Sequence, residues 1–138
     1  MQMSRWLGLD IGSKVIGVAV SDPLKLTARP LTSLRRTTID SDLQALVSLC
    51  REHSVEKIVV GRPARLSGEP SPFQQAVTEF AGQLEEASML PLVWSDERLS
   101  SKEAERLMAE QGIRISERRK LRDQYAAALI LQWYLDEQ

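Results

Sequence analysis

Residues 6–22 read WLGLDIGSKVIGVAVSD, and this stretch decides the fold. Two short apolar runs flank a Gly-Ser turn, which predicts a β-hairpin with strands over Arg5–Ile11 and Val15–Ser21. Asp10 lies inside the first strand, among residues that we expect to be buried. A carboxylate at such a position is costly unless a cation or hydrogen-bond donors meet it. Asp10 is therefore the first candidate functional residue.

Length and composition predict one soluble globular domain over residues 1–138, since 43% of the residues are hydrophobic and 27% are charged. The one cysteine, Cys50, excludes an intrachain disulfide and zinc sites built on cysteine pairs, and it agrees with a cytoplasmic location. The chain leads directly into its first strand, so we expect no signal peptide. Its longest apolar run, residues 126–131, is too short to cross a bilayer, so we expect no membrane partner.

The rest of the chain alternates between strand and helix patterns. The further strands are expected at Ala28–Arg35, Ile58–Gly61 and Leu90–Trp94, and the helices around Leu43–Cys50 and over Phe73–Leu84, Ser100–Gln111 and Ser116–Leu135. The order βββαβαβαα predicts an α/β fold, a mixed five-stranded sheet with helices on both faces. Right-handed crossovers place the fourth and fifth strands beside the first, so their carboxyl ends share one edge, where ligands bind in such sheets.

Three acidic residues can reach that edge. Asp10 is on the first strand, and Glu97, in preference to Asp96, follows the fifth. Asp123 shares the apolar stripe of the last helix, so we expect it to face the sheet. Clustered carboxylates repel one another unless a divalent cation binds them, and oxygen ligands select Mg²⁺ or Mn²⁺. Two such ions would suit in-line displacement at a phosphodiester. Structural ion pairs are the alternative for each acid taken singly.

Basic residues gather locally although the net charge is only −1. Residues 114–122 hold five cations and one acid, and smaller basic clusters occur at residues 35–36 and 62–65. Such clusters can bind a phosphate backbone, or they can be ordinary solvated charges. His53 is expected to cap a helix, and the three tryptophans are expected to pack in the core or at its rim.

Four motifs in order along the chain resemble those of the YqgF/RuvX family. They are Leu9–Lys14 with Ile16–Asp22, Val59–Pro63 followed by Gly68, Asp96–Ser101 followed by Glu103-Ala104, and Asp123–Gln132. The sequence departs from the family pattern at Val15, where arginine is usual, and at residues 64–67, where the family has an Asn and an Asp. These departures affect substrate contacts and leave the acids intact.

The resemblance implies an RNase H-like nuclease that matures the 5′ end of 16S rRNA. It also implies that Asp10, Glu97 and Asp123 are catalytic carboxylates that bind Mg²⁺ or Mn²⁺. The residues expected to contact the substrate are Lys14, Ser21, Arg62 and Arg98. The expected partner is structured or single-stranded RNA, and the chain is a monomer or a homodimer.

Three alternative functions stay open at this point. A junction resolvase would use the same chemistry on branched DNA, and it would need two symmetric sites and so a dimer. A nucleotide-binding module is compatible with the opening hairpin, but the chain has no Walker A pattern and no room for a second such domain. A catalytically silent RNA-binding factor would not need the three acids.

Overall fold

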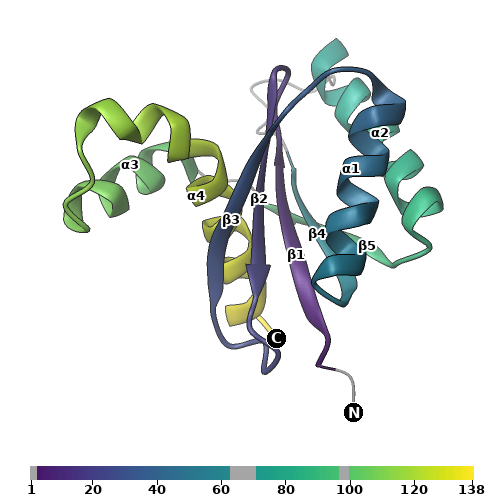
Figure 1. Cartoon of the computed structure of the whole chain (residues 1–138), viewed down its shortest axis with the longest axis horizontal. Coiled ribbons are helices and arrows are strands. Elements are labelled where there is room, and N and C mark those ends of the chain that lie inside the picture. The colour runs from purple at the N-terminus through teal and green to yellow at the C-terminus, as the bar shows by residue number, and fades with distance from the viewer. Residues whose placement is uncertain (1–2, 63–70, 97–99) are drawn as a thin grey trace.

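The computed structural model describes residues 3–62, 71–96 and 100–138, which form a sheet with helices on both faces (Figure 1). The elements are β1 (Arg5–Ile11), β2 (Val15–Ser21), β3 (Ala28–Arg35), α1 (Ile39–Glu52), β4 (Val55–Arg62), α2 (Pro72–Ser88), β5 (Leu92–Asp96), α3 (Ser100–Glu110) and α4 (Ile115–Asp136). The five strands follow the order β3-β2-β1-β4-β5. β1 pairs antiparallel with β2 and parallel with β4, which pairs parallel with β5. The predicted mixed sheet is confirmed.

Each face of the sheet has its own core. Leu7, Leu9 and Ile11 of β1 are buried with side chains of α1 and α2, including Leu46 and Phe80. The opposite face packs on α4, mainly through buried alanine, isoleucine and leucine side chains. None of the helices in the described part of the chain combines the length and the hydropathy that a bilayer crossing requires.

The bounds of the first three strands agree with the prediction, whereas β5 begins two residues later than expected. Met89 ends α2 in the left-handed conformation, at φ 58°. Pro91 then lacks an N–H for the ladder, although its carbonyl accepts a hydrogen bond from Ile58 N–H at 3.0 Å. At its other end β5 extends to Asp96. Ser95 and Asp96 belong to the strand, whereas the sequence predicted that they follow it.

The ends of α1 and α3 follow the sequence signals. His53 occupies the C-cap position of α1, as predicted. Gly112, at φ +75°, follows α3 and donates its N–H to Ala109 O at 3.1 Å. Ile113 N–H reaches back to Met108 O at 3.0 Å, which completes a Schellman motif. This turn reverses the chain into α4.

Helix α4 lies unusually close to the sheet because two glycines face it. A Cβ at Gly8 would lie 2.7 Å from Leu131 Cβ and 2.9 Å from the carbonyl oxygen of Ala127. A Cβ at Gly17 would overlap the backbone carbonyl of Asp123. Small residues therefore occur on both sides of this contact, since Ala127 and Ala128 of α4 are buried against the sheet that carries the glycines.

We expect Gly17→Ala to prevent stable folding, because the overlap involves the backbone of a packed helix. The cost should lie at the upper end of the about 1–3 kcal/mol typical of overpacking, or beyond it. Gly82→Ala is the control, since a Cβ there meets no atom within 4 Å, and it should be neutral or up to ~1 kcal/mol stabilising. Chemical denaturation of both variants checks this, and equal stability would contradict the close approach.

The Cys50 thiol should be inert in the folded protein. Burial raises the pKa of this thiol from 9.0 to about 11, and the thiolate is the reactive form. Because the folded pKa is the higher one, the thiol's contribution to stability is present below pH 9 and is lost as the pH rises through about 11. A disulfide reagent at pH 8 should label Cys50 rapidly only in denaturant. Rapid labelling of the native protein would show that the α1 side of the core is open.

Candidate active site

Asp10 lies one residue before the end of β1 and is half-buried. Side chains alternate along a strand, and Leu9 and Ile11 belong to the core on the α1–α2 side. Asp10 therefore faces α4, on the same side as Gly8. Its partner across the β1–β2 ladder is Gly17.

Gly17 also contacts α4 at the residue that the sequence singled out. The backbone of Asp123 lies directly over Gly17, in the space that a side chain would fill. Gly17 is thus the immediate neighbour of Asp10 on the sheet and of Asp123 on the helix. The structure brings these two predicted acids to one place, and Asp123 is half-buried there.

The electrostatics of Asp123 differ from those of a structural acid. Burial raises the pKa of its carboxyl, and the nearby Arg122 offsets this only in part. Within the described residues its side chain has no hydrogen bond or ion pair, whereas structural acids such as Asp42 have several. A half-buried carboxylate whose charged form is disfavoured by burial is suited to binding a cation.

The third predicted acid, Glu97, lies outside the described residues, as do Arg98 and residues 63–70. β5 ends at Asp96, whose ladder partner is Arg62 at the end of β4. Because β1, β4 and β5 are parallel, their carboxyl ends share the edge where Asp10 lies. The described residues by themselves contain no group of three acidic, histidine or cysteine side chains that could hold a metal ion.

The donor set at this edge fits a hard divalent cation. Asp10 and Asp123 offer carboxylate oxygens only, which suit Mg²⁺ or Mn²⁺. His53, the one histidine, ends α1, and Cys50 is buried in the core on the α1–α2 side. A zinc site with nitrogen or sulfur ligands therefore finds no donors here among the described residues.

Arg36 supports the hairpin that carries Asp10. Its guanidinium donates to Gly12 O at 3.0 Å and to Asp42 Oδ2 at 3.2 Å, and it stacks over the Phe80 ring at 4.9 Å. Its backbone N–H donates to Lys14 O at 2.8 Å. The sequence showed Arg36 only as part of a basic pair. Its supporting role could not be inferred there because the contacts are long-range.

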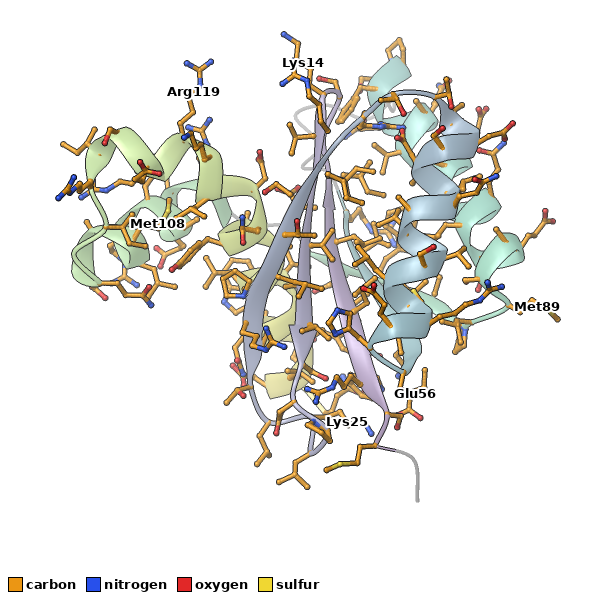
Figure 2. All side chains as sticks on the ribbon, viewed as in Figure 1. Lys14, Lys25, Glu56, Met89, Met108 and Arg119 are labelled. Atoms are coloured by element: carbon orange, nitrogen blue, oxygen red, sulfur yellow. The ribbon has the colours of Figure 1, made fainter. Side chains whose placement is uncertain are left out.

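Lys14 and Arg62 lie at the same edge of the sheet as Asp10. Lys14 is exposed at the tip of the hairpin, and Figure 2 shows it extending away from the body. The exposed Arg62 lies over the Trp94 ring at 5.3 Å. It borders a cavity of about 530 Å³, which Trp133 also lines.

Ser21 does not lie with these residues. It is fully buried at the far end of β2, where its hydroxyl accepts from Trp6 N–H at 2.9 Å and donates to Asp22 O at 2.9 Å. The Lys25–Glu56 ion pair marks the same end of the molecule, opposite Lys14 (Figure 2). Its burial and its hydrogen bonds give Ser21 a structural role. Its position at this end of the molecule does not support the predicted substrate contact.

Proteins similar to this chain match it over nearly its whole length. Relatives named as pre-16S rRNA nucleases occur in Moorella thermoacetica, at 46% identity over 132 residues, and in Clostridium kluyveri, at 42% over 132 residues. The aligned region covers 96% of this chain in both cases, and 94% and 96% of the respective relatives.

Solved structures show the same fold at low sequence identity. Thermus thermophilus RuvC in complex with a Holliday junction superposes with a TM-score of 0.60 at 13% identity, covering 96% of this chain and 94% of RuvC. The fowlpox virus resolvase in complex with junction DNA gives 0.62 at 11% identity, covering 96% and 97%. The fold is thus RNase H-like. The family RuvX, described as Holliday junction resolvase, matches residues 4–137, and the chain belongs to this family.

Proposed function

We propose that this protein is a metal-dependent nuclease that hydrolyses phosphodiester bonds. The observation that carries the proposal is the meeting of Asp10 and Asp123 at Gly17, on the sheet edge where three parallel strands end. Burial raises the pKa of the Asp123 carboxyl, and a divalent cation bound there would stabilise its charged form. The RNase H-like fold and the family membership agree with this function.

We propose 5′-end maturation of 16S rRNA as the reaction in the cell. Relatives at 42–46% identity are named for that substrate, and the alignments cover 94–96% of their length. Such a substrate would place the protein in the cytoplasm.

Asp10, Asp123 and Glu97 would hold Mg²⁺ or Mn²⁺, as one ion or two. A bound divalent ion supplies stabilisation of the attacking and leaving oxygens. Water would attack phosphorus in line, and the products would be a 5′-phosphate and a 3′-hydroxyl. Lys14 and Arg62, both exposed near the edge, would bind neighbouring phosphates of the substrate, and Arg98 is a further candidate.

Metal binding should raise the melting temperature of the wild type. A ligand at one hundred times its Kd stabilises a protein by roughly 2.7 kcal/mol, and Mn²⁺ is the probe to use. Asp10→Asn and Asp123→Asn should abolish the shift. Glu52→Gln, at the C-terminal end of α1, should retain it. An unchanged shift in Asp10→Asn would place the metal elsewhere.

Asp10→Asn should also lower cleavage by more than about 100-fold, because loss of even an outer partner of a metal ligand costs about 10–100-fold. The assay uses a fragment that spans the 5′ end of 16S rRNA, with Mn²⁺ or Mg²⁺, and Glu52→Gln, at the C-terminal end of α1, as the active control. Cleavage by Asp10→Asn at the wild-type rate would refute the proposed site.

Junction resolution is the second candidate, because the family description names that activity. A four-way DNA junction assayed beside the RNA fragment separates the two functions. Resolution would require paired, symmetric cuts and a dimer in solution. Cleavage of the RNA alone by a monomer would eliminate it.

A further inference from the structure

Helix α3 and the first part of α4, residues 100–122, form an arm beside the sheet. α3 packs mainly on α4, through the fully buried Ala104 and Met108. Figure 1 shows the arm extending away from the sheet on the side opposite α1 and α2. Ile115 at its tip is 79% exposed. The arm thus offers a surface that does not contribute to the main core.

The charges of α4 run against the dipole of the helix. Cations are favoured at the C-terminal end of a helix and anions at the N-terminal end. In α4 the first turn holds one acid, Glu117, but five basic residues lie among its first eight residues or just before them, and the last turn holds Asp136 and no basic residue. The basic residues in question are Arg114, Arg118, Arg119, Lys120 and Arg122. A distribution that lowers helix stability needs a reason other than stability.

Two of these five cations contact described residues through their side chains, and three do not. The guanidinium of Arg118 donates to Ile113 O at 2.9 Å, and that of Arg122 lies 3.7 Å from Oε1 of Glu105. Arg114, Arg119 and Lys120 are exposed, and their side chains have no hydrogen bond or ion pair with described residues.

Two of the three lie beside the candidate active site. Arg119 and Lys120 precede Asp123 by four and three residues, so they are its neighbours on the helix surface, one turn or ~5.4 Å along the axis. Figure 2 shows Arg119 at the same end of the molecule as Lys14. The hairpin and the arm therefore carry cations on two sides of the acidic pair.

We propose that Arg119 and Lys120 form a binding site for the phosphate backbone of the substrate strand on the arm side of Asp123. The proposal rests on the proposed nuclease function and adds where the nucleic acid extends beyond the reacting phosphate. Exposed cations contact phosphates without reading bases, so the site should bind independently of sequence. The positive end of the α4 dipole adds to the attraction.

The salt dependence of binding tests the site. The double variant Arg119→Gln/Lys120→Gln is compared with the wild type in metal-free buffer, on a single-stranded RNA and on an RNA duplex of the same sequence. Loss of two phosphate contacts should reduce the slope of log Kobs against log salt by about 1.4, at roughly 0.7 per contact for a single strand. The melting temperature should stay equal or rise, since the substitutions remove charges that oppose the dipole.

Arg51→Gln is the control for the loss of an exposed cation away from the site, because Arg51 lies in the last turn of α1, at the opposite end of the sheet. Its salt slope should equal that of the wild type, and its melting temperature should fall slightly, because a cation there suits the dipole. An unchanged salt slope in the double variant would overturn the arm site. Metal-dependent cleavage by the wild type would still support the nuclease function in that case. A wild type without metal-dependent cleavage would instead overturn the nuclease function.

Discussion

The contact between α4 and two glycines of the sheet is the constraint on which the structure depends. Helix α4 lies so close that a Cβ at Gly8 would crowd Leu131 and one at Gly17 would overlap the Asp123 carbonyl. Such close packing leaves few other positions for the helix on the sheet, because protein interiors hold little free volume. It sets the height and the rotation of α4 over the sheet. The position of Asp123 beside the strand that carries Asp10 follows from that placement.

The same constraint explains why the candidate site is electrostatically unusual. Helix and sheet together half-bury Asp123, which raises its pKa, and the nearby Arg122 offsets this only in part. Arg36 holds the hairpin from the other side through the Gly12 and Lys14 carbonyls. The packing of α4 therefore holds Asp123 in place, and the contacts of Arg36 hold the hairpin that carries Asp10. Pre-organisation of this kind suits a site that binds a cation and a phosphate.

The two halves of α4 differ in packing and in charge. The apolar face of its second half anchors it to the sheet, whereas the first half carries cations where the helix dipole disfavours them. A chain of net charge −1 that concentrates cations around its acidic pair has a local field suited to nucleic acid. The net charge does not show this local field, because the basic and acidic residues gather in different parts of the molecule and cancel only in the sum.

The sequence by itself determined the first three strands and the order of elements, because alternation, turn residues and helical spacing are local signals. The sheet topology then followed from the right-handedness of crossover connections. Asp10 and Asp123 were also evident, as polar residues within apolar patterns. Only the tertiary structure decided which motif residues meet. Ser21 belongs to the same hairpin as Lys14, but the seven residues of β2 span roughly 20 Å and place it at the opposite end. The supporting role of Arg36 and the contact of Gly17 with Asp123 join segments far apart in the chain, and such contacts leave no periodic signal in a single sequence.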